Sequence, residues 1–267
     1  MSFHLIDTHT HLYLDAFNDD RDAMISRALE AGVTRMLLPN IDINSIAGMH
    51  ALCDAYPHNC YPMMGLHPCD VQENFRDVLS DMDALFEHRK YVAVGETGID
   101  LYWDKTTLAQ QIESFEIQIE WAKKRDLPIV IHARDSYNEI FEVLDRLNDD
   151  RLRGVFHCFT GNLQQAHKIM DYGGFMMGIG GVLTYEKSGL AEVVKDIPME
   201  FLMLETDSPF LTPKPYRGKR NESTYVKFVA EKLSEIKQLS LQEIARITAA
   251  NAESMFRLES YSHSALK

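Results

Sequence analysis

The chain has 267 residues, of which 45% are apolar and 25% are charged. This is the composition of a globular protein, and it excludes a disordered, collagen-like or small disulfide-stapled chain. The 27 basic residues against 40 acidic ones give a formal charge of −13, which argues against a general basic nucleic-acid binder but leaves room for a local basic site.

No secretory signal and no membrane-spanning run is readable in the sequence. The N-terminal residues lack the basic and apolar regions of a secretory signal, and the longest uncharged apolar run, residues 173–185, is too short to span a bilayer. The four cysteines form no CxxC pair. We therefore expect a cytoplasmic protein without membrane association, whose cysteines are reduced and mostly buried.

Eight short apolar runs alternate with helix-like stretches, and their starts are 20 to 37 residues apart. The predicted strands are His4–Thr8, Arg35–Pro39, Tyr61–Leu66, Tyr91–Glu96, Pro128–His132, Gly154–His157, Gly174–Ile179 and Phe201–Glu205. This spacing fits one strand plus a returning helix, and it predicts a single-domain α/β chain, a (β/α)8 TIM barrel over residues 1–258 with a tail at 259–267. The alternative is an open doubly wound sheet, which usually carries a Gly-rich first turn that this chain lacks.

Three helices are predicted with definite bounds. Within Leu108–Arg125, apolar residues recur on one stripe, as expected for a helix that packs on the barrel. Two more helices, Tyr225–Lys237 and Ser240–Arg257, follow the last strand. Ser240 and Glu243 fit a capping box at the start of the second of these.

Histidines and carboxylates follow the ends of most predicted strands: His9, His11, His67, Glu96, His132, His157 and Asp207. The C-terminal ends of barrel strands converge on one face, so these side chains are expected to meet there. His9 and His11 are two residues apart and can point at one ion. His67 alone could equally be a core histidine. Four imidazoles and two carboxylates complete two adjacent metal sites if one carboxylate bridges, and we expect Glu96 to be the bridge.

At these positions the sequence resembles the TatD family of metal-dependent deoxyribonucleases, a branch of the amidohydrolase barrels, from Ile6 to about Arg257. The segments that carry the resemblance are Asp7-Thr8-His9-Thr10-His11-Leu12, Gly65-Leu66-His67-Pro68, Val94-Gly95-Glu96-Thr97-Gly98-Ile99-Asp100, Ile131-His132-Ala133-Arg134, His157-Cys158-Phe159-Thr160-Gly161, Glu205-Thr206-Asp207-Ser208-Pro209 and Arg217-Gly218-Lys219-Arg220-Asn221-Glu222. One departure is Ser223, where the family usually has proline, and we expect it to loosen the start of the following helix.

The resemblance implies two divalent ions per chain that share Glu96. One ion is then held by His9, His11, Glu96 and Asp207, and the other by Glu96, His132 and His157. Imidazole-rich ligation favours zinc, manganese, iron or nickel, whereas family members are commonly described as magnesium-dependent. The identity of the ion therefore stays open among Mg, Mn, Zn and Ni.

Asp207, Glu96 and His67 are the predicted catalytic residues. Asp207 is expected to accept a proton from a metal-activated water, the alternative being that it is a ligand only. His67 is expected to hydrogen-bond the phosphate or the leaving oxygen. Glu205, two residues before Asp207, is expected to orient a ligand rather than to react.

Substrate contacts are predicted around the same mouth. Arg134 could clamp a phosphate or be an ordinary loop arginine, and Tyr102 and Trp103 could stack on a nucleobase or pack under a loop. The loop after Asp207 holds Lys214, Arg217, Lys219 and Arg220 with no acidic residue between Ser208 and Asn221. We expect Lys219 and Arg220 in particular to bind a polyanion.

By resemblance, the enzyme cleaves phosphodiester bonds of DNA, as a 3′–5′ exodeoxyribonuclease on single-stranded ends that uses a metal-activated water. The alternative is a metal-dependent amidohydrolase-type esterase or deacylase that acts on a small or aminoacyl-tRNA substrate. A metal-storing protein is disfavoured, because storage needs neither open positions at a barrel mouth nor a proton acceptor. The sequence leaves the oligomeric state open and is compatible with a monomer.

Overall fold

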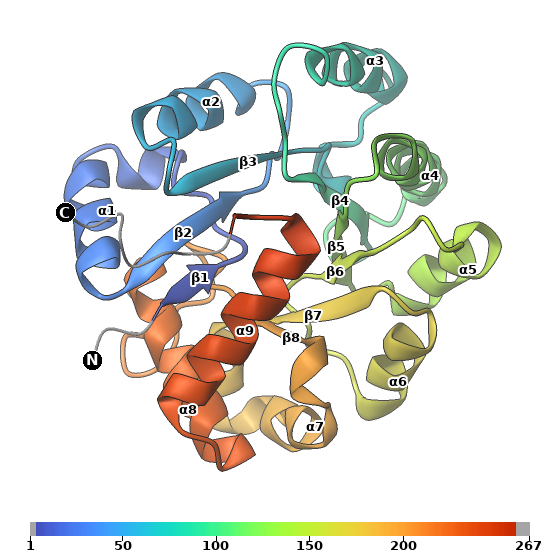
Figure 1. Cartoon of the computed structure of the whole chain (residues 1–267). Helices are drawn as coiled ribbons and strands as arrows, with labels where there is room; N and C mark the ends of the chain where they lie inside the picture. Colours follow the sequence, from blue (N-terminus) through green and yellow to red (C-terminus); the bar gives the residue numbers. More distant parts are fainter. Residues whose placement is uncertain (1–3, 260–267) are drawn as a thin grey trace.

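The computed structural model describes residues 4–259, which form a barrel of eight parallel strands in the order β1 to β8 with helices around it (Figure 1). The strands are β1 (Leu5–Asp7), β2 (Val33–Leu38), β3 (Cys60–Met64), β4 (Ala93–Asp100), β5 (Ile129–Arg134), β6 (Gly154–Phe156), β7 (Phe175–Ile179) and β8 (Leu202–Leu204). The helices are α1 (Arg21–Glu30), α2 (Ile46–Ala55), α3 (Phe75–Leu85), α4 (Leu108–Arg125), α5 (Tyr137–Leu147), α6 (Leu163–Asp171), α7 (Leu190–Asp196), α8 (Val226–Lys237) and α9 (Leu241–Phe256). The predicted (β/α)8 barrel is confirmed, and the open doubly wound sheet is excluded.

The barrel closes where β8 meets β1. The amide of Thr8 donates to the carbonyl of Leu204 over 3.0 Å, and the amide of Asp207 donates to the carbonyl of His9 over 2.9 Å. The carboxylate of Asp7 reinforces this seam by accepting from the amide and the hydroxyl of Thr206. The segments that carry His9 and Asp207 are therefore fixed side by side.

Helix α9 covers the N-terminal end of the barrel and crosses in front of it in the view of Figure 1. Four of its buried residues, Ala249, Ala252, Met255 and Phe256, pack on one apolar layer inside the barrel. That layer consists of Ile6, Leu37, Met63, Ala93, Val130, Val155 and Met203. The capping box predicted for this helix is confirmed, since Ser240 and Glu243 bond each other's backbone amides. One end of the barrel is thus plugged by apolar side chains, which leaves the opposite end for chemistry.

Two local expectations were wrong. Strand β4 continues past Glu96 to Asp100, because Gly98 adopts a φ of 131° and keeps the chain paired with β5 at His132. Ser223 does not loosen the following helix: it is buried in a 3-10 turn, and its hydroxyl donates to Asp7 over 2.6 Å. A proline could not make that hydrogen bond.

The remaining expectations concern the ends of the chain, membranes and cysteines. Apart from Glu259, the tail predicted at 259–267 lies outside the described residues. Within residues 4–259, no helix combines the length and apolar character needed to cross a bilayer. All four cysteines are free, and burial is less general than expected: Cys53 and Cys60 are buried, Cys158 is half-buried and Cys69 is exposed.

Candidate metal centre and active site

Glu96 of β4 lies at the centre of the histidine cluster and is only 2% exposed. The side chains around it come from the C-terminal ends of β1, β3, β5, β6 and β8. The structure therefore brings together all seven residues that were predicted to meet at this face: His9, His11, His67, Glu96, His132, His157 and Asp207.

The two carboxylate oxygens of Glu96 face two different groups of side chains. Its Oε2 lies 3.1 Å from His9 Nε2 and 3.6 Å from His11 Nε2. Asp207 belongs to the same group, with its Oδ1 3.8 Å from His9 Nε2 and 3.5 Å from His11 Nε2. Three potential ligand atoms and one oxygen of Glu96 thus surround one position.

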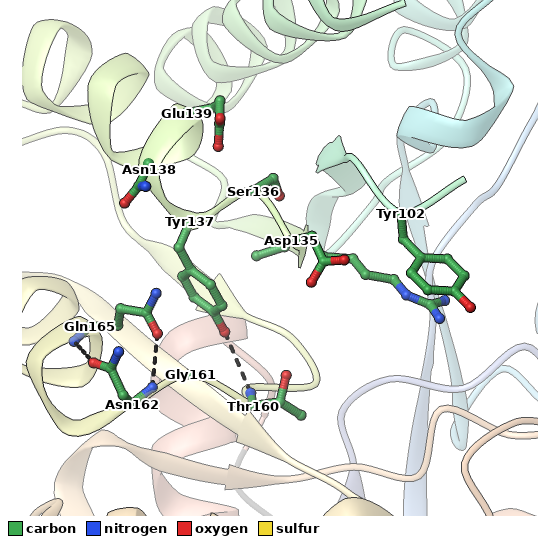
Figure 2. A pocket seen from close by; sticks show the side chains of 12 residues that line it. Tyr102, Asp135, Ser136, Tyr137, Asn138, Glu139, Thr160, Gly161, Asn162 and Gln165 are labelled. Carbon is green, nitrogen blue, oxygen red and sulfur yellow. Dashed lines mark hydrogen bonds between the residues drawn. The ribbon is translucent and has the colours of Figure 1, made fainter. Parts of the chain in front are cut away.

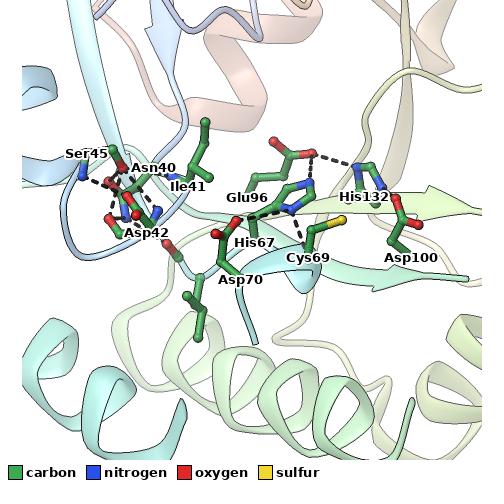
Figure 3. A network of polar contacts seen from close by, with 12 residues as sticks. Asn40, Ile41, Asp42, Ser45, His67, Cys69, Asp70, Glu96, Asp100 and His132 are labelled. Carbon is green, nitrogen blue, oxygen red and sulfur yellow. Dashed lines mark hydrogen bonds and ion pairs between the residues drawn. The ribbon is translucent and has the colours of Figure 1, made fainter. Parts of the chain in front are cut away.

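The other oxygen, Oε1, faces the second group. It lies 2.9 Å from His132 Nδ1 and 3.5 Å from His67 Nε2 (Figure 3). It also lies 3.0 Å from His157 Nε2. The rings of His9 and His157 stack with centroids 3.7 Å apart, which brings the two groups next to each other. Among residues 4–259, Glu96 is the carboxylate that contacts both groups.

The spacing of these donors fits metal ions. Two ligands that each lie about 2.1 Å from one tetrahedral ion are roughly 3.4 Å apart, which matches the contacts around both oxygens of Glu96. In two groups of three residues, all potential ligand atoms lie within 4.8 Å of one another. The first group is His9, His11 and Glu96, and the second is His67, Glu96 and His132. Imidazole and carboxylate together suit a divalent transition metal.

Hydrogen bonds to the outer nitrogen of two histidine rings, His132 and His11, fix where each ring presents its lone pair. His132 Nε2 donates to Asp100 Oδ2 over 2.9 Å, so its Nδ1 lone pair faces Glu96. His11 Nδ1 donates to the hydroxyl of Tyr13 over 3.1 Å, because that hydroxyl itself donates to the carbonyl of Pro39. His157 Nδ1 lies 3.3 Å from Glu205 Oε1. The rings of His132 and His11 are therefore oriented as ligands, with the proton outside and the lone pair inside.

His67 has the opposite arrangement. Its Nδ1 accepts a hydrogen bond from the amide of Cys69 over 3.1 Å, so the neutral ring carries its proton on Nε2, toward Glu96. A ring that presents N–H to the centre is suited to donate a hydrogen bond rather than to bind an ion. His67 therefore differs from His132 and His11, because its ring proton points toward Glu96 rather than away from it.

Glu205 sits in a pocket made by a glycine. A Cβ on Gly178 of β7 would lie 2.0 Å from Glu205 Oε2, so only glycine leaves room for this carboxylate. Glu205 Oε1 also accepts from the amide of Cys158 over 2.5 Å. The carboxylate is therefore fixed against the residue that follows His157.

The ionisation of Glu96 and His9 suits cation binding. Burial acts to raise the pKa of Glu96, but the neighbouring His157, His9 and His67 hold that pKa well below its usual range. Burial and the nearby His157 lower the pKa of His9. Glu96 is therefore a carboxylate and His9 a neutral imidazole at neutral pH, and these are the forms that bind metal ions.

Sequence reasoning missed Asp100 and Tyr13, which hydrogen-bond the rings of His132 and His11. Asp100 lies inside one of the matched segments, four residues after Glu96, and its second oxygen accepts from the amides of Tyr102 and Trp103. One carboxylate thus connects the His132 ring to the loop with the exposed aromatic residues. Asp100 was missed because the predicted strand ended at Glu96, whereas β4 stays paired with β5 up to Asp100.

The predicted aromatic and phosphate contacts come together on one side of the centre. The guanidinium carbon of Arg134 lies 3.9 Å from the ring centroid of Tyr102 and 5.5 Å from that of Trp103. Both rings are largely exposed, 54% for Tyr102 and 70% for Trp103. On the other side, Phe210 is 51% exposed with its ring centroid 6.2 Å from that of His11, and sequence reasoning missed this residue.

The basic loop after Asp207 is less free than its sequence indicates. Arg220 binds both oxygens of Asp20, over 2.7 and 2.9 Å, and Lys214 pairs with Glu186 over 2.8 Å. Lys219 lies over the ring of Tyr216. Acidic residues distant in the sequence thus neutralise two of the loop's four charges, and contact of Lys219 and Arg220 with a polyanion stays a prediction.

A barrel with a histidine and carboxylate cluster at the C-terminal ends of its strands is the architecture of a metal-dependent hydrolase. The family described as TatD related DNase matches residues 6–257 of this chain. The chain belongs to the TatD family of metal-dependent hydrolases and is a hydrolytic enzyme.

Individual relatives agree with this assignment. The chain is 39% identical to the uncharacterized metal-dependent hydrolase YabD of Bacillus subtilis, over 95% of this chain and 99% of that one. It is 33% identical to the 3′-5′ ssDNA/RNA exonuclease TatD of Salmonella typhimurium, over 95% and 99%. The solved structure of YjjV, a TatD homologue of Escherichia coli, superposes with a TM-score of 0.91 at 32% identity and covers 97% of this chain and 100% of that one.

Proposed function

We propose that this hydrolase cleaves phosphodiester bonds of single-stranded nucleic acid and removes nucleotides from the 3′ end, with two divalent ions that share Glu96. The observation that carries the proposal is the division of contacts around Glu96, next to an exposed guanidinium and aromatic rings. The similarity to a relative named as a 3′-5′ ssDNA/RNA exonuclease supports the substrate class.

His9, His11 and Asp207 would hold one ion with Glu96 Oε2, and His132 and His157 the other with Glu96 Oε1. Such ions supply an activated water and neutralise the charge that develops on the phosphate. Asp207 would be placed to take up a proton from the attacking water. Its pKa is below the usual range: burial opposes this shift, but His11, His157 and His9 favour the carboxylate, so the group is ionised at neutral pH.

His67 acts as a hydrogen-bond donor in this proposal. Its Nε2 proton faces the centre from the Oε1 side of Glu96, where it can bond a phosphate oxygen or the departing sugar oxygen. Arg134, fixed on the Tyr102 ring, would bind a phosphate of the strand, while Tyr102 and Trp103 offer ring faces to unpaired bases. Exposed rings favour unpaired bases because paired bases in a duplex stack on each other.

The test is an assay of chelated and then metal-loaded protein on single-stranded and duplex DNA labelled at the 3′ or the 5′ end. Single-stranded RNA, an aminoacyl-tRNA and a p-nitrophenyl phosphodiester serve as comparison substrates. We expect release of mononucleotides from the 3′ end of single strands, with each of Mg, Mn, Zn and Ni tried separately. Turnover of the aminoacyl ester without cleavage of any nucleic acid would replace this proposal with the esterase or deacylase alternative.

A further inference from the structure

A cavity of about 720 Å³ opens beside the metal centre, between the loops that follow β5 and β6 (Figure 2). Arg134 at its mouth is two residues beyond His132, and Thr160 in its wall is three residues beyond His157. Its volume falls in the range of about 300–1,000 Å³ that is typical of small-molecule sites. Of its lining residues, the proposed function uses only Arg134 and Tyr102.

The wall formed by the start of α6 presents hydrogen-bond donors. In the capping box of this helix, Gln165 Oε1 accepts from the amide of Asn162 over 2.8 Å, and Asn162 Oδ1 accepts from the amide of Gln165 over 2.9 Å. The box uses only the carbonyl oxygen of each side chain, so each NH2 group remains available as a donor. The same bonds hold the two side chains in place beside the cavity (Figure 2).

Tyr137 adds a third donor. Its hydroxyl oxygen accepts from the amide of Thr160 over 3.4 Å, which leaves the hydroxyl hydrogen to be donated to a ligand. Burial raises the pKa of this phenol above its usual range, so the hydroxyl keeps its hydrogen at any physiological pH. A ligand at this wall must therefore offer acceptor oxygens or ring nitrogens.

The lining also includes the carboxylates of Asp135 and Glu139. They would repel a phosphate from the interior of the cavity, but they can accept from a sugar hydroxyl or an exocyclic amine. The cation in the lining is Arg134, which rests on Tyr102 and makes no ion pair with a carboxylate among residues 4–259. These charges favour a phosphate next to Arg134 and an uncharged group next to Asp135 and Glu139.

We propose that this cavity binds the nucleoside of the nucleotide adjoining the phosphate held at the metal centre. The base directs its acceptor atoms to Asn162, Gln165 and Tyr137, the sugar lies toward Asp135 and Glu139, and the phosphate lies between Arg134 and the metal ions. This subsite rests on the proposed nuclease function and adds to it the groups that recognise one whole nucleotide beside the cleaved bond.

Gln165→Glu is the sharpest variant, because glutamate keeps the oxygen that completes the capping box but lacks the NH2 donor. Tyr137→Phe removes the third donor without a change of charge. Gln238→Glu, at an exposed position after α8, is the control for the added negative charge. Melting temperatures of all four proteins establish that each variant is folded.

The first measurement is calorimetric binding of thymidine 5′-monophosphate and of inorganic phosphate to metal-loaded protein. We expect Gln165→Glu and Tyr137→Phe each to weaken binding of the nucleotide about tenfold, with phosphate binding and the Gln238→Glu control unchanged. Nucleotide binding that is absent from the wild type, or equal in all four proteins, would overturn the proposal.

The second measurement separates this proposal from the nuclease function. On a short oligothymidylate, both cavity variants should raise KM about tenfold, whereas turnover of bis(p-nitrophenyl) phosphate, which has no nucleoside, should not change. If the wild type binds thymidine 5′-monophosphate through these donors but cleaves no oligonucleotide, the cavity is supported and the nuclease function is wrong. If the wild type cleaves oligonucleotides and both variants keep its KM, the nuclease function stands and the cavity proposal is wrong.

Discussion

The two ends of the barrel use the same strands for opposite purposes. At the N-terminal end, Val130, Val155 and Met203 belong to the apolar layer under α9. His132, His157 and Glu205 each come two residues after one of these three positions. Side chains two residues apart in a strand point to the same face. Only two positions along each strand therefore separate the apolar layer from the cluster of buried ionisable groups.

The two ends are stabilised in different ways. The apolar layer needs only close packing and the removal of α9 and the strands from water. The opposite end buries Glu96 and the imidazoles, which are costly to desolvate unless they contact one another or an ion. The N-terminal end should therefore determine the stability of the fold, and the C-terminal end should determine metal binding and catalysis.

The largest effect is expected from Glu96→Gln. The amide cannot supply a negatively charged oxygen to both ligand groups, so at least one ion should be lost. We expect hydrolysis to fall about a thousandfold, or roughly 4 kcal/mol in activation free energy. Metal content by mass spectrometry and the rate on a phosphodiester measure this. Full metal content with wild-type rates would contradict the role of Glu96.

Met203→Ala tests whether the N-terminal end of the barrel determines stability without affecting metal binding. Met203 is fully buried in the layer under α9, so its truncation should lower the free energy of unfolding by about 2–5 kcal/mol. Denaturant unfolding measures the loss, and metal content per folded molecule should stay at the wild-type value. A variant that keeps its stability but loses metal would show that the two ends are not separate.

Asp100→Asn tests how the protein orients His132. The variant retains the shape of the side chain but lacks the charge that accepts from His132 Nε2, and we expect metal affinity to fall about 10- to 100-fold. Competition with a chelator measures the affinity independently of turnover. An unchanged affinity would mean that the His132 ring is oriented by its packing alone.

The smallest effect is expected from Asp20→Asn at the rim. Its pKa is lowered to about 2, chiefly by the hydrogen bond from Arg220, so the carboxylate stabilises the fold above the unfolded-state pKa of about 4 and loses this contribution as the pH falls toward 2. Because the pair is partly exposed, the variant should lose less than about 1 kcal/mol at pH 7. Unfolding measured at pH 7 and at pH 2 or below should show a difference at pH 7 that is largely lost at the lower pH.

Much of the fold and of the metal centre could be predicted from the sequence. Apolar runs at regular spacing define the strands, and ligand-type residues such as His132 and His157 stand directly at their ends. Because parallel strands of a barrel end on one face, placing each residue on its own strand was sufficient to bring the cluster together.

Contacts between distant loops could not be predicted in this way. The pairing of Arg220 with Asp20 depends on how the loops after β1 and β8 pack, and no local pattern encodes it. The hydrogen bond from Ser223 to Asp7 likewise spans 216 residues of sequence. The role of Asp100 was hidden for a different reason: glycine at 98 continues a strand that the apolar pattern alone ends early.

The most direct test of the central claim, that Glu96 is shared by two metal ions, is an anomalous difference map from crystals grown with manganese or zinc. The account predicts two peaks, one on each side of the Glu96 carboxylate: the first contacts His9, His11 and Asp207, and the second contacts His132 and His157. A single peak, or a peak bound by His67 Nε2, would contradict it.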